Sequence, residues 1–379
     1  MSAPKKITFL TATRADFGKL QPLIASIYRD DAYDVQILAT GMHLLAEYGL
    51  TVNEIYRAGF RRIHAISNQD IGDGMSDALA STVQLVSRYL DHNETDLLVV
   101  HGDRIEPMGA TLAACLKNVR VGHIEGGEVS GTIDEMLRHS ISKLSQVHFV
   151  SNNVARDRLV QMGEAPSSVF VIGSPSLDII LSKKLPDLAA VKRHYEIPFE
   201  RYLLLLFHPV TTEQNTFAEA NTIVDAILAG GYNAVVVLPN NDAGRAEICK
   251  AYRRLENRPQ IRIFPSIRFE SYLTLLNNAT CIVGNSSSGI HEAPVFGVPS
   301  VNIGTRQHLR SNAPSIVSVA GDAAAIRNAV DDALKSPRLA PTFDFGHGNS
   351  AANFKDVLDG GRIWDIPIQK HFLDSGLHG

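Results

Sequence analysis

Three carboxylates are the residues whose type and spacing point most directly to chemistry. Asp103 and Glu125 follow two short apolar runs, 97–100 and 119–124, and Asp134 lies on the next loop. The carboxyl ends of neighbouring parallel strands meet at one edge of a sheet, and open α/β sheets bind their ligands there. Carboxylates gathered at such an edge perturb one another's pKa values, which suits general acid and base catalysis. The alternative for each residue alone is an ordinary acid of a turn or a helix cap.

Glycines and histidines accompany these acids. Gly102 and Gly126 flank them, and glycine lets a ligand approach the backbone closely. His101, His123 and His139 offer nitrogen ligands, but their spacing matches no zinc-binding pattern. We therefore expect supporting roles for these histidines and no metal site.

A run of small hydroxyl residues forms the second candidate site. The apolar run 281–283 leads into Gly-Asn-Ser-Ser-Ser-Gly and then into a helix. Serine hydroxyls and free amides at the start of a helix bind a diphosphate well. Glu292, one to two turns further on, is placed to accept hydrogen bonds from ribose hydroxyls. The alternative is an ordinary serine cap, but three serines exceed what a cap requires. The expected diphosphate-binding residues are Ser286, Ser287, Ser288 and Gly289.

Basic and amide side chains follow other predicted strands. Arg14 and Lys19 come after the run 7–12 and place positive charge near the start of a helix, where backbone amides already favour an anion. The alternative is a surface helix that Thr13 caps and whose charges are solvated. The polar residues that follow predicted strands in the second half of the chain include His208 and Asn241, and we expect Asn241 to contact the substrate.

The predicted strands are not followed by a glycine-rich cofactor motif. Neither Gly-x-Gly-x-x-Gly nor the P-loop lysine motif occurs after them, which argues against a nicotinamide cofactor. We expect the chain to work without a cofactor.

Short β-rich runs alternate with helical patterns along the chain, and the whole pattern occurs twice. Such alternation predicts parallel crossover units and two doubly wound, Rossmann-like α/β domains that face each other across a cleft. We expect the domain break near residues 181–198, which contain charged residues and prolines but no strand pattern. The expected division is residues 1–182, residues 183–360 and a tail, residues 361–379, that packs back on the first domain. The predicted strands are residues 7–12, 35–39, 97–100, 119–124, 147–150, 169–172, 202–207, 234–238, 261–264, 281–283 and 300–303.

Composition narrows the class of protein. The 379 residues are 45% hydrophobic and 20% charged, which is typical of globular proteins. A net charge of −4 leaves no basic surplus for nucleic acid. No apolar run reaches the roughly 18–20 residues of a membrane span, and 7–10 is too short for a signal sequence. The three cysteines lack metal or redox spacing, so we expect a cytoplasmic protein without nucleic-acid or membrane partners.

Together these motifs resemble the UDP-N-acetylglucosamine 2-epimerases, and most of all their hydrolysing, sialic-acid-pathway branch. The resemblance extends from residue 7 to about residue 310 and implies a GT-B-type arrangement of the two domains. The matching blocks are residues 13–19, 101–104, 123–128, 134, 138–143, 207–211 and 284–287.

The resemblance implies a two-step reaction. Enzymes of this family eliminate UDP from UDP-N-acetylglucosamine in the anti sense to give 2-acetamidoglucal. The hydrolysing branch then adds water in the syn sense and releases N-acetylmannosamine and UDP. The catalytic carboxylates of the family fall on Asp103, Glu125 and Asp134, and aspartate at the third position is typical of the hydrolysing branch. We expect Asp103 to take the proton from carbon 2, and Glu125 and Asp134 to handle reprotonation and water.

The resemblance also implies the substrate contacts and the partners. We expect UDP to bind Arg14, Lys19, Ser286, Ser287 and Glu292. We expect His208 and Arg14 to neutralise charge on the departing diphosphate from opposite domains. The uracil base is expected to meet the backbone near residues 267–269, which include Arg268, with Tyr272 as a further candidate. UDP-sugar and UDP are the expected ligands, and a homodimer is expected because relatives commonly dimerise.

Other functions remain open. One is the same reaction on UDP-2,4-diacetamido-2,4,6-trideoxyglucose, in a legionaminic-type pathway. A GT-B glycosyltransferase uses the same fold and a similar nucleotide loop. A nucleotide-sugar sensor without catalysis is the third.

Overall fold

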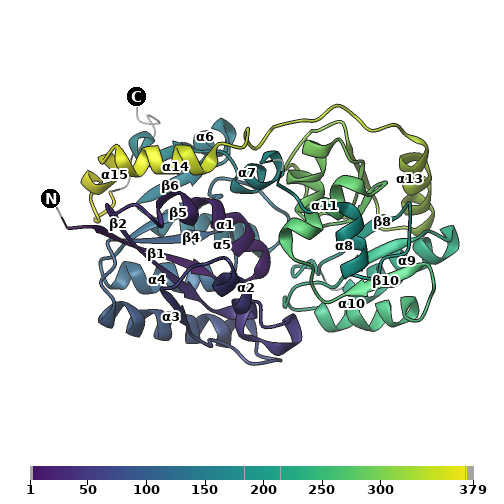
Figure 1. Ribbon diagram of the computed structural model, residues 1–379, viewed down its shortest axis with the longest axis horizontal. Helices are drawn as coiled ribbons and strands as arrows, with labels where there is room; N and C mark the ends of the chain where they lie inside the picture. The colour runs from purple at the N-terminus through teal and green to yellow at the C-terminus, as the bar shows by residue number, and fades with distance from the viewer. Residues whose placement is uncertain (1–2, 183, 214, 372, 374–379) are drawn as a thin grey trace. The chain divides into compact units, whose positions relative to one another are not determined.

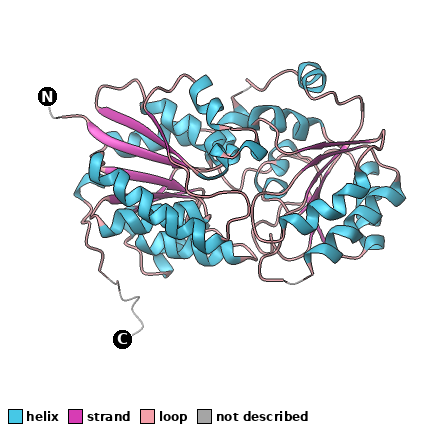
Figure 2. Ribbon diagram, turned by 90° about the horizontal axis from the view of Figure 1, so that it is seen from below, coloured by secondary structure: helices cyan, strands magenta, loops and turns pink. Residues whose placement is uncertain are grey.

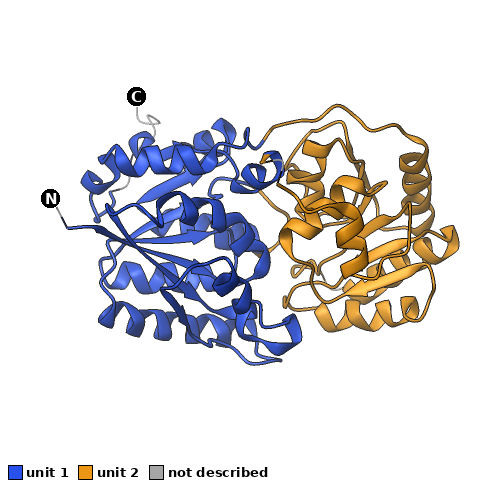
Figure 3. Ribbon diagram, in the orientation of Figure 1, with its two compact units in different colours: residues 1–128, 134–181, 345–379 blue, residues 129–133, 182–344 orange. Residues whose placement is uncertain are grey.

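The chain divides into two compact units, which Figure 3 colours separately. The computed structural model describes residues 3–182, 184–213, 215–371 and 373. Unit 1 comprises Met1–Glu128, Asp134–Leu181 and Phe345–Gly379, and unit 2 comprises Val129–Ile133 and Ser182–Asp344. Each unit contains one sheet with parallel pairing and flanking helices, so the predicted α/β class with two doubly wound sheets is confirmed.

The sheet of unit 1 has seven strands in the order β3-β2-β1-β4-β5-β6-β7. The order reverses between β1 and β4, and the carboxyl edge at such a switch point is where open α/β sheets bind ligands. The strands are β1 (Lys5–Thr11), β2 (Tyr33–Ala39), β3 (Ile63–Ala65), β4 (Leu97–His101), β5 (Arg120–Ile124), β6 (Val147–Val150) and β7 (Val169–Val171).

Helices cover both faces of this sheet, as Figure 2 shows. Successive side chains of a strand point to opposite faces. Phe9 of β1 therefore joins the core beneath α1 and α14, whereas Leu10 joins the core beneath α3 and α4. Among the described residues, no helix combines the length and the hydropathy that a bilayer span requires. The helices of unit 1 are α1 (Arg14–Ile27), α2 (Val52–Arg57), α3 (Met75–His92), α4 (Ile105–Leu116), α5 (Ile133–Leu144), α6 (Asn153–Gln161), α7 (Pro175–Leu181), α14 (Ser350–Asp359) and α15 (Arg362–Asp365).

The sheet of unit 2 repeats the design with six strands in the order β10-β9-β8-β11-β12-β13. Its switch point lies between β8 and β11. The strands are β8 (Leu203–Leu206), β9 (Ala234–Val237), β10 (Ile261–Phe264), β11 (Ile282–Gly284), β12 (Ser300–Ile303) and β13 (Ile316–Val319). The helices are α8 (Leu188–His194), α9 (Thr216–Gly230), α10 (Arg245–Tyr252), α11 (Phe269–Asn278), α12 (Ser288–His291) and α13 (Ala323–Lys335).

The C-terminal segment belongs to unit 1, where α14 lies beside α1 (Figure 1). Phe354 is fully buried, and its ring centroid lies 6.1 Å from that of Phe9 and 4.9 Å from that of Phe149. Arg120 of β5 donates hydrogen bonds to the carbonyls of Trp364 and Ile366, at 3.1 and 2.7 Å. Apolar burial and backbone hydrogen bonds thus attach this segment to the first sheet.

The compact units do not follow the expected division into residues 1–182, 183–360 and 361–379. Residues 345–360, expected with the second sheet, lie in unit 1, because α14 buries its apolar face there. The contacts that define the compact units do not test which stretches of the chain fold on their own. As a statement about independently folding domains, the expected division stays a prediction.

Candidate active site

Asp103 lies just beyond β4, at the switch point of unit 1. Its carboxylate forms an ion pair with Arg138 of α5, a side chain that is only 1% exposed. Arg138 also donates from Nη1 to the carbonyl of Glu128 at 3.3 Å. The side chain of Asp103 keeps 24% of its exposure, and the cap position of α4 belongs to Arg104. A buried guanidinium therefore fixes a carboxylate that a ligand can still reach.

Glu125 follows β5 and is almost buried. Its Oε1 accepts a hydrogen bond from Lys19 Nζ at 2.9 Å, and His101 Nε2 lies 3.3 Å from the same oxygen. Its backbone has φ +64°, and its N–H donates to the carbonyl of Phe149 at 3.1 Å. A positive φ is unfavourable for a residue with a Cβ, and such strained positions cluster at functional sites.

Asp134 lies in the first turn of α5, so the expectation that it lies on a loop is wrong. The first turn, Ile133–Glu135, contains two acids and no run of apolar residues, which hides the start of the helix from a periodicity search. Arg138 follows four residues later, and residues four apart lie on one face of a helix. Asp134 is thus on the face of α5 that carries the partner of Asp103.

At the start of α1 the predicted helix cap is present, and the two basic side chains are both paired with carboxylates. Thr13 caps the helix and forms a capping box with Asp16. Arg14 forms an ion pair with Glu54 at 2.7 Å, and Lys19 pairs with the glutamate beyond β5. Both cations therefore have carboxylate partners inside unit 1.

The glycines differ in what they allow. Gly102 has φ +78°, and among the described residues other than its two chain neighbours no atom lies within 4 Å of a Cβ built there. By contrast, a Cβ at Gly126 would lie 2.8 Å from Ser142 Oγ, and one at Gly127 would lie 2.2 Å from the carbonyl oxygen of Ala155. Gly126 thus lets the loop pack against its own unit, and only Gly102 fits the expected approach of a ligand.

The three histidines contact neighbouring groups. His101 lies beside Glu125, as described above. His123 is completely buried and is hydrogen-bonded through both ring nitrogens. His139 Nε2 lies 3.5 Å from the carboxylate of Glu135 on the same helix.

His208 and Asn285 join the two switch-point loops of unit 2. Asn285, fully buried after β11, accepts a hydrogen bond from the His208 N–H at 2.7 Å and donates to the His208 carbonyl at 2.9 Å. The backbone N–H of Asn240 faces His208 Nδ1 at 3.5 Å. A neutral His208 in this setting carries its proton on Nε2.

The serine loop begins at a backbone position that requires glycine. Gly284 has φ +129°, and a Cβ there would lie 1.9 Å from the carbonyl oxygen of Leu206. Ser286 Oγ accepts a hydrogen bond from the Ser288 N–H at 3.3 Å, and Ser287 makes no capping hydrogen bond with its side chain. The hydroxyl of Ser287 is therefore not used as an ordinary cap.

The helix after this loop is shorter than expected. The four-residue α12 passes directly into a 3-10 helix, Ala293–Phe296. A single turn sums few peptide dipoles, so hydroxyls and first-turn amides must supply most of the attraction for an anion.

Residues behind the serine loop are buried. Tyr272 donates from its hydroxyl to Ser288 Oγ at 2.8 Å, and burial raises the pKa of this phenol. A Cβ at Gly289 would lie 2.5 Å from Ser300 Oγ. Glu292 is 3% exposed, and its Oε1 has no hydrogen-bond partner within the part of the chain that the structure describes. A buried carboxylate oxygen without a hydrogen-bond partner in the chain is suited to accept a hydrogen bond from a ligand, such as one from a ribose hydroxyl.

Two further residues expected to contact the substrate follow β9 and β10 of unit 2. Asn241 follows β9 and is half-buried. Arg268 is exposed at the N-cap position of α11, and its backbone N–H donates to the hydroxyl of Tyr195 at 3.1 Å.

Three residues of these edges were not among the expected site residues. Arg138, His101 and Asn285 each hold an expected residue in place. All three lie inside the family-matching blocks 138–143, 101–104 and 284–287, and the spacing of four between Asp134 and Arg138 was a further local sign of the first. His101 is the last residue of β4 and Asn285 immediately follows β11, which are the kinds of position where the other candidates were found.

Comparison with known proteins identifies the family of the chain. The family model for UDP-N-acetylglucosamine 2-epimerase matches residues 25–359. The chain is 40% identical to the UDP-N-acetylglucosamine 2-epimerase of Neisseria meningitidis serogroup B, over 98% of this chain and 100% of the relative. It is 33% identical to the hydrolysing UDP-N,N'-diacetylbacillosamine 2-epimerase of Legionella pneumophila, over 98% of each chain.

Solved structures share the fold. The crystal structure of a UDP-GlcNAc 2-epimerase from Neisseria meningitidis bound to UDP-GlcNAc has a TM-score of 0.81 at 18% identity, and covers 94% of this chain and 100% of that chain. The Methanocaldococcus jannaschii UDP-GlcNAc 2-epimerase in complex with UDP-GlcNAc and UDP has a TM-score of 0.80 at 19% identity, with the same coverage. The resemblance to the UDP-N-acetylglucosamine 2-epimerases that the motifs indicated is confirmed at the level of the family. The chain belongs to the UDP-N-acetylglucosamine 2-epimerase family of enzymes.

Proposed function

We propose that this enzyme converts UDP-N-acetylglucosamine and water to N-acetylmannosamine and UDP. The observation that carries the proposal is the carboxyl edge of unit 1. There Asp103 and Glu125 follow adjacent strands and are each held by a cation. The 40% identity to a UDP-N-acetylglucosamine 2-epimerase supports the substrate.

The first step is elimination of UDP. The hydrogen on carbon 2 is not adjacent to a carbonyl, so it becomes acidic only as the anomeric C–O bond stretches. Asp103 removes this proton while UDP leaves with the electron pair of the C–O bond, and a double bond forms between carbons 1 and 2. The negative charge of the base also stabilises the developing oxocarbenium ion. Arg138 keeps the carboxylate oriented for this transfer.

The second step is hydration of the glycal. Water adds to carbon 1, and a proton reaches carbon 2 on the face opposite to the one it left. A second acid is therefore needed. We assign Glu125, which lies beside Lys19 and His101, and Asp134 to reprotonation and to the water.

The nucleotide is assigned to unit 2. Ser286 and Ser287 are half-buried, and the capping role that the sequence allowed is not used by the Ser287 side chain. Their hydroxyls donate to the diphosphate, His208 neutralises charge on the leaving UDP, and Glu292 accepts hydrogen bonds from the ribose. The buried Oε1 of Glu292 without a partner supports the ribose assignment.

Nuclear magnetic resonance of the product tests the proposal. Enzyme incubated with UDP-N-acetylglucosamine in deuterated water is expected to release UDP and N-acetylmannosamine deuterated at carbon 2. Unlabelled N-acetylmannosamine would refute elimination. Release of UDP only when a sugar acceptor is added would instead identify a glycosyltransferase, and binding without turnover would identify a sensor.

A second substrate is favoured by two further relatives. The chain is 33% and 32% identical to diacetylbacillosamine 2-epimerases of Legionella pneumophila and Campylobacter jejuni. The chemistry is unchanged, and only the groups on carbons 4 and 6 of the sugar differ. The ratio of kcat/KM for the two UDP-sugars decides between them, and we expect UDP-N-acetylglucosamine to be preferred. The expected homodimer stays a prediction, which light scattering after gel filtration tests.

A further inference from the structure

We propose that His123 and Ser142 form a buried positioning pair that fixes the three elements bearing Asp103, Glu125 and Asp134. The proposal rests on the proposed function for its effect on turnover. Its structural part is independent of the substrate.

The pair has one defined protonation state. His123 Nε2 lies 2.8 Å from the carbonyl oxygen of Gly102, and Nδ1 lies 2.9 Å from Ser142 Oγ. A carbonyl can only accept, so Nε2 carries the hydrogen and Nδ1 accepts from the serine hydroxyl. Burial lowers the pKa of His123 to about 3, so the ring stays neutral near neutral pH.

The two hydrogen bonds connect the loop of Asp103 to α5. Gly102 immediately precedes Asp103, and its own N–H donates to the carbonyl of Ile124 at 3.0 Å. Ser142 lies on α5, the helix that carries Asp134 and Arg138. Because Arg138 pairs with Asp103, the helix and the loop are joined twice, once by the ion pair and once through His123.

The loop of Glu125 packs directly on the same pair. A Cβ at Gly126 would lie 2.8 Å from Ser142 Oγ and 3.0 Å from His123 Nδ1. Only a glycine therefore lets the residue after Glu125 sit against the intact hydrogen bond. His123 and Ser142 thus define the position of both carboxylate loops relative to α5.

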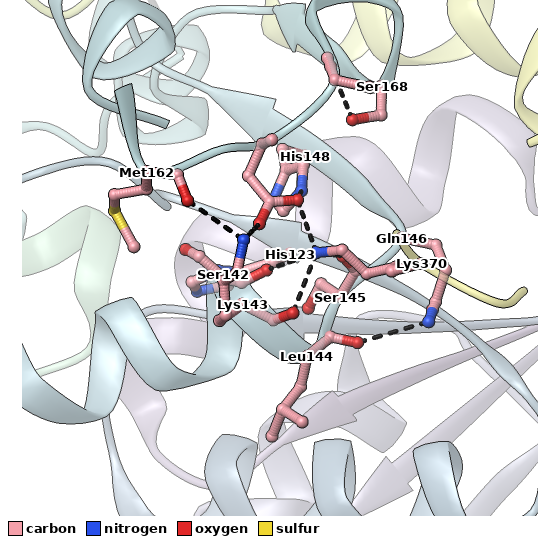
Figure 4. Close-up of polar contacts among 12 residues, drawn as sticks. His123, Ser142, Lys143, Leu144, Ser145, Gln146, His148, Met162, Ser168 and Lys370 are labelled. Carbon is pink, nitrogen blue, oxygen red and sulfur yellow. Dashed lines mark hydrogen bonds and ion pairs between the residues drawn. The ribbon is translucent and has the colours of Figure 1, made fainter. Parts of the chain in front are cut away.

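A matched control lies on the next strand. His148 of β6 is paired in register with His123 of β5 and is equally buried. Figure 4 shows the polar contacts around the two histidines. Its Nε2 lies 3.0 Å from Glu164 Oε2, and Lys143 and Lys370 also pair with Glu164, at 3.0 and 2.5 Å. The His148 network ties the C-terminal segment to α5, since Lys370 Nζ also donates to the backbone carbonyls of Ser142, Lys143 and Ser145. The ring of His148 itself hydrogen-bonds Glu164, whereas that of His123 bonds Gly102 and Ser142. Substitution at His148 therefore reports loss of a buried histidine without loss of the pair.

The test compares His123→Phe and His123→Gln with His148→Phe and His148→Gln. We expect His123→Phe to lower kcat by about 10- to 100-fold, the scale of a misplaced catalytic group, with nearly unchanged KM. His123→Gln restores most of kcat because its amide can donate to the Gly102 carbonyl, and the pH profile of kcat keeps its shape. Ser142→Ala added to His123→Phe lowers kcat little further, since both changes break one pair. The His148 variants lower thermal stability but not kcat.

Hydrogen–deuterium exchange measures directly whether the two carboxylate loops lose their fixed positions. Because it needs no substrate, it separates this inference from the proposed function. In His123→Phe, peptides covering residues 101–104 and 124–128 are expected to exchange faster than in the wild type, and in His148→Phe they do not. Unchanged exchange there, or an equal loss of kcat in the His148 variants, would overturn the positioning role. If the wild type does not turn over either UDP-sugar, the proposed function fails while exchange still decides the role of the pair. Should His123→Phe not fold, His123→Gln and Ser142→Ala carry the same comparison.

Discussion

The carboxyl edges of the two sheets share one topology but differ in chemistry. Both strand orders reverse beside the first strand of the unit. The edge of unit 1 is charged, with Lys19 on Glu125 and Arg138 on Asp103. The edge of unit 2 is built largely from neutral hydroxyl and amide groups, joined through the buried Asn285. Topology therefore decides where a site lies, and side chains decide what it does.

The difference bears on which edge binds the diphosphate. An anion at unit 1 must compete with Glu54 for Arg14 and with Glu125 for Lys19. A hydroxyl such as that of Ser287 donates to an anion without breaking an ion pair. We therefore expect unit 2 to dominate nucleotide affinity and unit 1 to dominate turnover.

Lys19→Met probes the charged edge and has the largest expected effect. Removing one partner of a buried ion pair costs up to about 3–5 kcal/mol of unfolding free energy, and His101 beside the same oxygen of Glu125 offsets part of that loss. Denaturant unfolding measures the loss. Adding Glu125→Gln should recover much of it, because both charges are then removed. A single variant as stable as the wild type would mean that the pair is solvated.

Asp103→Asn separates turnover from binding. The amide keeps the shape of the side chain but cannot take a proton, so kcat is expected to fall by about 100-fold or more. UDP affinity, measured by calorimetry, should not change. Undiminished turnover would remove Asp103 from the chemistry.

Ser286→Ala is the reciprocal change at the neutral edge. Loss of a charge-assisted hydrogen bond is expected to weaken UDP binding by about 1–2 kcal/mol. Turnover at saturating substrate should stay close to that of the wild type. If UDP affinity is unchanged, the serine loop does not hold the diphosphate.

Acid is expected to destabilise unit 1 through its buried histidines. Burial lowers the pKa of His43 to about 4 and that of His123 to about 3, from an ordinary value of 6.5. Between pH 6.5 and pH 4 the unfolded chain binds more protons than the folded chain, so stability is complete above this window and falls as pH falls. Each histidine contributes at most about 1.4 kcal/mol per pH unit. Unfolding followed against pH should show a shallower slope for His43→Gln; an identical slope would contradict the assignment.

The sequence predicted the interior of both sheets better than their edges. Each predicted strand overlaps an observed one, because central strands are continuous apolar runs. The edge strands β7 and β10 were also predicted, whereas the other two edge strands, β3 and β13, were not. They are short and partly exposed, as in Ile316–Val319, so their residues lack the apolar run that marks a buried strand.

For the site, the sequence predicted which residues end strands but not what holds them. Asp103 and Glu125 follow β4 and β5 as expected. The ion pair between Asp103 and Arg138 spans 35 residues, and the positive φ of Glu125 depends on packing around its loop. Neither the ion pair nor the positive φ leaves a pattern in the nearby sequence, because contacts between distant segments are set by the tertiary fold.

A crystal structure of Asp103→Asn with UDP-N-acetylglucosamine tests the division of labour most directly, since this variant should bind substrate without consuming it. We predict the diphosphate in hydrogen-bond contact with Ser286 and Ser287, the ribose on Glu292, and carbon 2 of the sugar facing residue 103. A nucleotide bound away from the serine loop, or a sugar whose carbon 2 is remote from residue 103, would contradict it.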